Sequence, residues 1–169
     1  TRGVLGVILP EACTPQLAVL ARLIVAEAAQ GFAPDPVRRL AALLPPSPEV
    51  AETVAARLRL SKVQRTRLVT AAERRAEDAD QPKALAYRLT IPLAVDRLLL
   101  AGGDAQELNL WSAPPFPIKG GAIVARGITA GPAVARILQA VEARWIAEGF
   151  PDSQRLDVLL AEELARAGS

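Results

Sequence analysis

The chain has 169 residues, of which 51% are apolar, so it can bury a sizeable core and is excluded from the intrinsically disordered class. Its 20 basic and 18 acidic side chains leave a net charge of +2, which excludes a general polyanion binder of the histone type. With 33 Ala, 24 Leu and only six aromatic residues, the composition predicts an all-α fold.

The sequence contains no histidine, and this excludes several kinds of catalytic and metal-binding site. A Ser-His-Asp triad, a Cys-His pair and an imidazole metal site are all excluded. The single cysteine, Cys13, cannot form an internal disulfide, so we expect a cytoplasmic protein in which Cys13 is a small buried or helix-capping residue. The chain begins at Thr1 and contains no Met, and we interpret it as a piece of a longer protein.

The longest apolar stretch runs from Leu17 to Ala29 and is interrupted by Arg22 and Glu27. It is shorter than the ~20 residues that a membrane-spanning helix needs. We therefore expect a buried core helix here and no membrane partner.

Helix starts are marked by a capping residue followed by proline at Thr14, Asp35, Ser47 and Gly131, because proline at the first helical position loses no hydrogen bond. Ser61 with Gln64 forms a capping-box pattern. These signals and the apolar periodicity predict a bundle of short helices at about 14–30, 35–44, 47–58, 61–78, 83–90, 92–101, 104–110, 119–126, 132–148 and 153–167.

A proline-rich segment, residues 111–117, has three prolines in seven residues and cannot be helical. It predicts a boundary between a larger helical body, residues 1–110, and a smaller C-terminal helical subdomain, residues 111–169. In the second part an apolar stripe follows one helix at offsets 0, 3, 4, 7 and 11, and we expect it to face the core: Val134, Ile137, Leu138, Val141 and Trp145.

Basic residues are concentrated between Arg57 and Arg75, where seven cations accompany the single acid Glu73. Such a segment could contact phosphates, or it could be a solvated helix face. Aromatic residues that could stack on bases are nearly absent around it, which favours contact with a nucleic-acid backbone over base reading.

Two other motifs are weaker. Asp78 and Asp80 have the D-x-D spacing of a magnesium site, but they follow a charged helical run, and we interpret them as a solvated helix end. The Gly127–Gly131 turn before a helix could admit a phosphate at the helix N-terminus, although glycines also serve as ordinary turn and cap residues.

The C-terminal region carries a resemblance to a known family. Phe116-Pro-Ile-Lys-Gly-Gly121 is followed by Ile123-Val-Ala-Arg-Gly-Ile-Thr-Ala-Gly-Pro-Ala-Val-Ala-Arg-Ile-Leu138 and by Glu142-Ala-Arg-Trp145. This pattern resembles the C-terminal region of bacterial CCA-adding tRNA nucleotidyltransferases and related poly(A) polymerases. The opening Gly3–Glu11 and the segment Leu58–Lys62 resemble the start of the body and a helix start in that family. Ala122 and Ala135 stand where the family pattern has Asp and Gly.

The resemblance implies that residues 1–110 are a tRNA-binding body and residues 111–169 a tail, which hold tRNA while a head that precedes this chain in the family adds nucleotides to the 3′ end. The resemblance implies Mg²⁺ and CTP or ATP as cofactors of that head. For this chain it implies no cofactor, no catalytic residue and no metal-binding residue. This chain is then expected to bind tRNA but not to catalyse the addition of nucleotides. The candidate RNA-binding residues are Arg57, Arg59, Lys62, Arg65, Arg67, Lys119, Gly120, Arg126, Gly131 and Arg136.

Two alternatives remain open. Gly127-Ile128-Thr129 and the turn that follows suggest a helix-hairpin-helix DNA-binding module, although Thr129 stands where that motif has glycine. A helical protein-interaction domain that binds no nucleic acid is the other.

Overall fold

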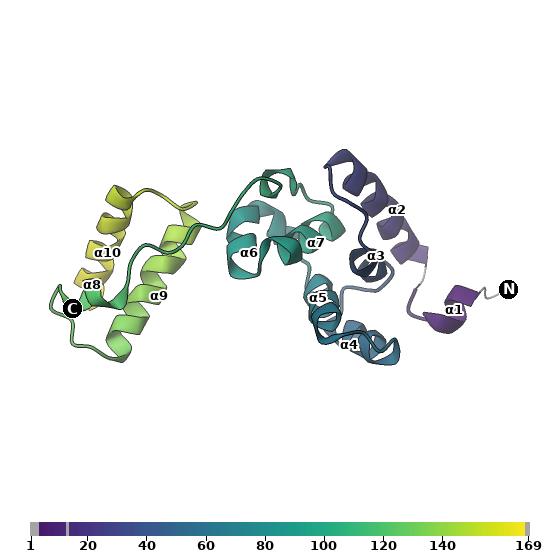
Figure 1. The fold of residues 1–169 in the computed structure, drawn as a ribbon, viewed down its shortest axis with the longest axis horizontal. Coiled ribbons are helices and arrows are strands. Elements are labelled where there is room, and N and C mark those ends of the chain that lie inside the picture. The colour runs from purple at the N-terminus through teal and green to yellow at the C-terminus, as the bar shows by residue number, and fades with distance from the viewer. Residues whose placement is uncertain (1–3, 13, 168–169) are drawn as a thin grey trace. The chain divides into compact units, whose positions relative to one another are not determined.

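The computed structural model describes residues 4–12 and 14–167, which form helices and no β-strand (Figure 1), so the all-α prediction is confirmed. The described chain forms two compact units that divide between Ser112 and Ala113. Among the described residues, every helix is too short or too polar to cross a lipid bilayer. Cys13 lies outside the described residues.

The first unit contains seven α-helices and two 3₁₀ turns within its described residues. They are α1 (Val4–Ile8), α2 (Thr14–Ala29), α3 (Pro36–Ala42), α4 (Pro48–Arg57), α5 (Lys62–Ala72), η1 (Ala76–Asp80), α6 (Pro82–Arg88), α7 (Ile91–Ala101) and η2 (Gln106–Leu108).

Capping residues determine where these helices begin. The Asp35 carboxylate accepts hydrogen bonds from the amides of Val37 and Arg38, both at 2.9 Å. Ser61 and Gln64 form the predicted capping box, and Pro36, Pro48 and Pro82 each occupy the first turn of a helix. The sequence prediction of the helix starts is thus confirmed at these positions.

Helix α5 ends earlier than predicted. The expected helix over 61–78 stops at Ala72, and the Arg74 guanidinium donates to the backbone carbonyls of Ala71 and Leu44. The 3₁₀ turn η1 then brings Asp78 against α7, where its carboxylate binds Arg97 with distances of 2.8 and 2.7 Å. The interpretation of Asp78 as a solvated helix end was wrong, because its side chain is buried by this pair.

Helix α7 is the centre of the first unit. Seven consecutive residues, Ala94 to Leu100, are buried, as expected for a helix surrounded by others on all sides. It packs against α2, α3, α5, α6 and η1. Helix α3 likewise packs against α2 and α5, two neighbours that it shares with α7.

A buried network of ion pairs crosses this core and joins α2, α3, α5 and α7. Asp96 of α7 is fully buried and accepts hydrogen bonds from Arg38 and Arg67. Glu27 of α2 is also buried and accepts from Arg38 at 2.8 Å and from Arg39 at 3.0 Å. The second oxygen of Asp35 accepts from Arg67 at 2.8 Å. Three guanidinium groups and three carboxylates therefore balance within the network.

Helix α2 corrects one sequence prediction. It was expected to be buried, but only Leu23 and Glu27 are buried along its length, whereas Leu17, Ile24 and Val25 are exposed. The physical reason is that its partners, α3 and α7, cover one side of the helix alone.

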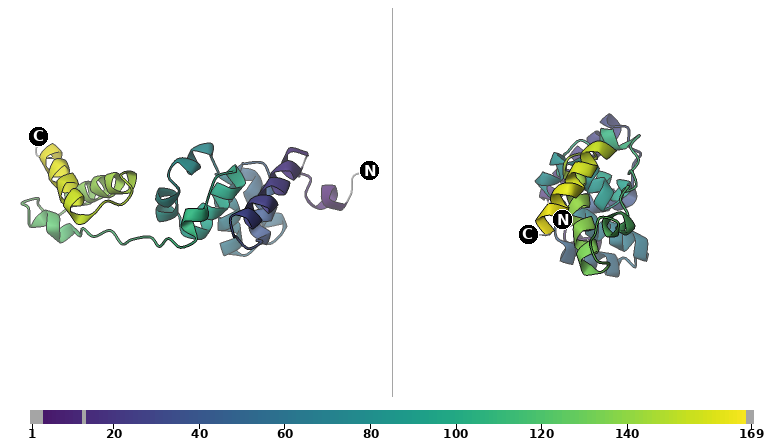
Figure 2. Two further views of the ribbon diagram at one scale, coloured as in Figure 1. Left: turned by 90° about the horizontal axis from the view of Figure 1, so that it is seen from above. Right: turned by 90° about the vertical axis from the view of Figure 1, so that its left-hand side faces the viewer.

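The second unit has three helices within its described residues: α8 (Gly120–Val124), α9 (Pro132–Ala147) and α10 (Ser153–Ala167). Both α8 and α10 pack against α9 (Figure 2). Of the predicted stripe, Val134, Ile137, Val141 and Trp145 are buried and Leu138 is partly buried. The indole nitrogen of Trp145 donates to the Pro151 carbonyl at 2.9 Å.

We predict that Asp96→Asn lowers the free energy of unfolding of the first unit by roughly 3–5 kcal/mol, because it removes the charge of the buried carboxylate that Arg38 and Arg67 share. Urea unfolding followed by circular dichroism measures this change. Asp80→Asn is the control, since Asp80 is exposed and such changes usually stay within about 0.5 kcal/mol. Equal stability of the two variants would contradict the role of the network.

Asp35 gives the network a dependence on acid pH. Partial burial by itself raises the pKa of this carboxyl, but hydrogen bonds from the Arg38 amide and the Arg67 guanidinium outweigh burial and lower the pKa. A lowered folded-state pKa contributes stability above the unfolded value of about 3.9, and that contribution is lost as the pH falls through the folded value.

Asp35→Asn removes this titration. We expect the variant to be less stable than the parent at neutral pH, and to lose less further stability as the solution is acidified from about pH 5 to pH 3. Chemical unfolding at a series of pH values measures both quantities. A variant that loses stability on acidification as steeply as the parent would contradict this assignment.

Candidate nucleic-acid interface

The corner between α4 and α5 holds the densest part of the predicted basic segment. Helix α4 ends in a Schellman arrangement, in which the Arg59 amide donates to the Ala56 carbonyl at 3.1 Å and the Leu60 amide to the Ala55 carbonyl at 3.0 Å. Ser61 then caps α5, so Arg59 and Lys62 are separated by one short turn.

Arg59 has an unusual backbone. Its φ of +53° lies in the left-handed region, at the helix-end position where glycine is ordinarily found. A side chain in this conformation costs about 1–2 kcal/mol relative to glycine. The Arg59 side chain is exposed and forms no ion pair with any described residue, so the compensation for this cost comes from the backbone hydrogen bonds that end α4 and not from the side chain.

The backbone of Phe150 can be compared with that of Arg59. It is the other described residue apart from glycine with positive φ, at +64°. Its ring packs edge-on against Trp145 with the centroids 5.0 Å apart, so its conformation brings an aromatic side chain into the core of the second unit. The positive φ of Arg59 serves the end of α4 through backbone hydrogen bonds and leaves its side chain exposed.

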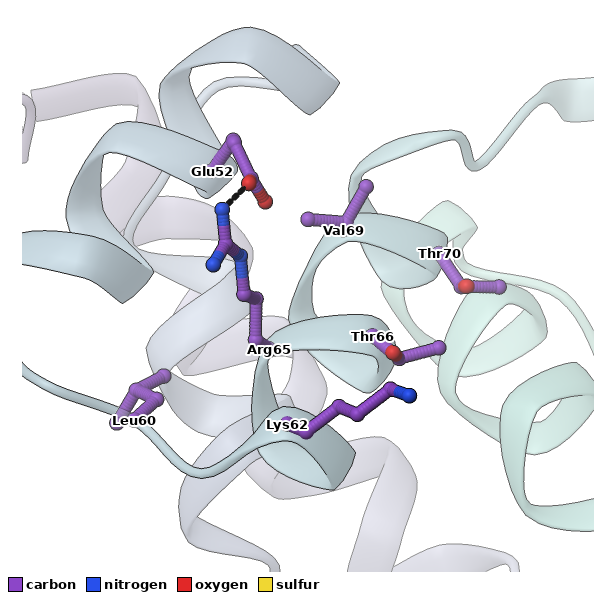
Figure 3. A pocket seen from close by; sticks show the side chains of 7 residues that line it. All are labelled: Glu52, Leu60, Lys62, Arg65, Thr66, Val69 and Thr70. Carbon is purple, nitrogen blue, oxygen red and sulfur yellow. Dashed lines mark ion pairs between the residues drawn. The ribbon is translucent and has the colours of Figure 1, made fainter.

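Two hollows flank the outer face of α5. The larger, about 630 Å³, is lined by residues of α4, α5 and the turn between them (Figure 3): Glu52, Leu60, Lys62, Arg65, Thr66, Val69 and Thr70. The smaller, about 450 Å³, lies between α5 and the start of α7 and is lined mainly by apolar atoms. Lys62 and Thr66 border both hollows, because residues four apart share one face of a helix.

The charges at this corner are only partly free. Arg65 is paired with Glu52, and in Figure 3 its guanidinium reaches toward that carboxylate, whereas the Lys62 ammonium extends away from the pair. Lys62 is exposed and has no acidic partner among residues 4–12 and 14–167. An unpaired ammonium, an unpaired guanidinium and the Thr66 hydroxyl suit the oxygens of a phosphate backbone.

The other predicted cations of the first unit have internal partners. Arg57 binds Glu11 at 2.6 Å, and this hydrogen bond lowers the pKa of Glu11. Arg67 borders the smaller hollow, but all three of its guanidinium nitrogens donate to Asp35 and Asp96. The hydrogen bond to Asp96 raises the pKa of Arg67, which keeps it charged inside the network.

The candidate residues of the second unit form a separate group. Arg126 binds Asp157 at 3.2 Å. Gly120 is explained by packing, because a Cβ there would approach Val134 at 3.3 Å. Gly131 has φ of +146° before α9 and opens onto free space. Within the described part of the chain, neither Lys119 nor Arg136 forms an ion pair, and both are exposed.

Thr66 is the residue at this corner that the sequence analysis missed. Its spacing of four residues from Lys62 is the signal that could have identified it. No three Asp, Glu or Cys side chains of the described residues lie close enough together to hold a metal ion.

Comparison with known proteins adds no assignment: no family model, curated protein or solved structure matches this chain. Membership of the nucleotidyltransferase family therefore stays a prediction from the residues that carry the resemblance.

The strain at Arg59 leads to a stability prediction. Arg59→Gly is expected to raise the free energy of unfolding by about 0.5–1 kcal/mol, after the greater flexibility of glycine in the unfolded chain is subtracted. Phe150→Gly relieves similar strain but loses the contact with Trp145, and we expect it to destabilise. Urea unfolding of both variants tests the contrast. A destabilised Arg59→Gly would show that the arginine side chain supports the fold.

Proposed function

We propose that this chain binds folded RNA through the α4–α5 corner, as the tRNA-holding part of a nucleotidyltransferase of the CCA-adding and poly(A) polymerase type. The observation that carries the proposal is the pair Arg59 and Lys62, two exposed cations with no acidic partner in the part of the chain that the structure describes, one of them at a backbone position where glycine is ordinarily found. The resemblance over Phe116–Trp145 supports the family, and the all-helical fold agrees with it.

The corner fits backbone contact better than base reading. The side chains that line the larger hollow are aliphatic, hydroxylic or charged, and none is aromatic among those that the structure describes there. Recognition of an A-form helix through phosphates and hydroxyls needs no stacking platform. Binding is therefore expected to depend on the shape of the RNA and on salt, with little dependence on sequence.

On this proposal the nucleotide transfer belongs to residues outside this chain. Mg²⁺ and CTP or ATP act there, while the chain itself binds tRNA without extending it. Extension of a labelled tRNA by this chain in the presence of Mg²⁺ and both nucleotides would contradict this division of roles.

The test is binding of fluorescent tRNA at a series of salt concentrations. We expect Arg59→Ala and Lys62→Ala each to weaken binding and to reduce the slope of log K against log salt by about 0.7–0.9, the value for one lost phosphate contact. The two residues lie at the surface, so the variants are expected to remain folded.

Lys83→Ala is the matched control. It removes the same charge from an α6 side chain that pairs with Glu107, outside the α4–α5 corner. An equal effect of Lys83→Ala would show that net charge alone governs binding. Equal affinity for duplex DNA and tRNA would favour the helix-hairpin-helix alternative, and no binding at low salt would refute the proposal.

A further inference from the structure

The outer face of α2 is an apolar surface that the first unit leaves uncovered. Leu17, Ile24 and Val25 are 49%, 43% and 68% exposed. The alanines on the same side, Ala18, Ala21, Ala28 and Ala29, are exposed as well. Isolated exposed apolar side chains are ordinary, but a contiguous face of this kind marks an interaction surface.

No charged side chain interrupts this face. Arg22 lies at its edge and is turned toward α7, where its guanidinium donates to the Leu100 carbonyl at 3.4 Å. Glu27 lies on the opposite side of α2 and belongs to the buried network. Between Leu17 and Ala29, a partner of this face therefore meets mainly apolar side chains.

The residues of the face follow a heptad spacing. Leu17, Ala21, Ile24 and Ala28 are separated by four, three and four positions, the spacing of the seam between two packed helices. Large and small side chains alternate along the seam. Close helix pairs fill their interface when each large residue meets a small one.

This alternation is complementary to itself. When two copies of α2 pair in antiparallel orientation about a two-fold axis at the middle of the seam, Leu17 of one copy faces Ala28 of the other, and Ala21 faces Ile24. Each large residue is then opposite an alanine in every layer. A two-fold dimer requires a surface patch of this kind, which fits its own copy.

We propose that α2 forms an antiparallel helix pair with α2 of a second copy of this chain. The absence of charges along the seam means that the two-fold axis brings no like charges together. A helix of 16 residues is about 24 Å long, and one such pair buries less than the ~1,200 Å² of a standard stable interface. The dimer is therefore concentration-dependent.

This association uses a surface distinct from the α4–α5 corner. Helices α2 and α5 pack against the shared partners α3 and α7, and the exposed face of each helix points away from those partners. Self-association is thus independent of the proposed RNA binding, and each can fail without the other.

Sedimentation equilibrium at a series of protein concentrations tests the proposal. We expect a reversible monomer–dimer equilibrium in the parent chain, and a dissociation constant at least about tenfold higher in Leu17→Glu, equivalent to ~1.4 kcal/mol. Val63→Glu is the control, because Val63 is 77% exposed on α5 and lies outside the seam. Leu17→Glu is expected to leave tRNA binding unchanged.

A size swap tests the register. Ile24→Ala leaves a void opposite Ala21, and Ala21→Ile places two isoleucines against each other, so each single variant is expected to weaken the dimer. The double variant restores a large residue opposite a small one and is expected to dimerise like the parent. Circular dichroism confirms that each variant is folded.

Three outcomes would overturn the inference. They are a parent chain that stays monomeric throughout the concentration series, a dimer that withstands Leu17→Glu, and a double variant that dimerises no better than the single ones. The last result would show that α2 associates without the proposed antiparallel register.

Discussion

The first unit depends on a balanced set of buried charges. Arg38 reaches both Glu27 and Asp96, and Arg67 reaches both Asp35 and Asp96, so four helices share one electrostatic centre. Every buried side-chain nitrogen and oxygen that the structure describes has a hydrogen-bond partner, which is the condition under which buried charge is tolerated. Helices as short as α3 are unstable alone, and this centre makes their formation conditional on the whole unit.

The same centre determines which cations face solvent. Helix α5 directs the guanidinium of Arg67 to the carboxylates, whereas Lys62 and Thr66, which border the smaller hollow together with Arg67, are exposed. The basic segment therefore divides into residues that hold the fold and residues that stand free. The smaller set that remains is the one on which the proposed RNA contact rests, and it includes Arg59 at a backbone position where glycine is ordinarily found.

The helices could be predicted from the sequence because their starts are local. Asp35, Ser47 and the pair Ser61 and Gln64 cap helices through atoms at most three residues away, and such patterns are visible in a string of letters. Which candidate cations are paired and which are free to bind a ligand could not be predicted in this way. Whether Arg67 or Arg57 is free depends on Asp96 and Glu11, which are 29 and 46 positions distant and are brought near only by the assembled fold. The exposed side of α2 was missed for the same reason, since an apolar helix does not reveal which of its sides finds a neighbour.

Placing an inward arginine and an outward lysine five positions apart on α5 has a consequence for how this segment can change over time. One inserted or deleted residue between Lys62 and Arg67 rotates one of them by about 100° relative to the other. Either the carboxylates lose their arginine or the surface loses its lysine. Natural variants of this stretch are thus free to exchange the side chain at Val63, yet their length is fixed.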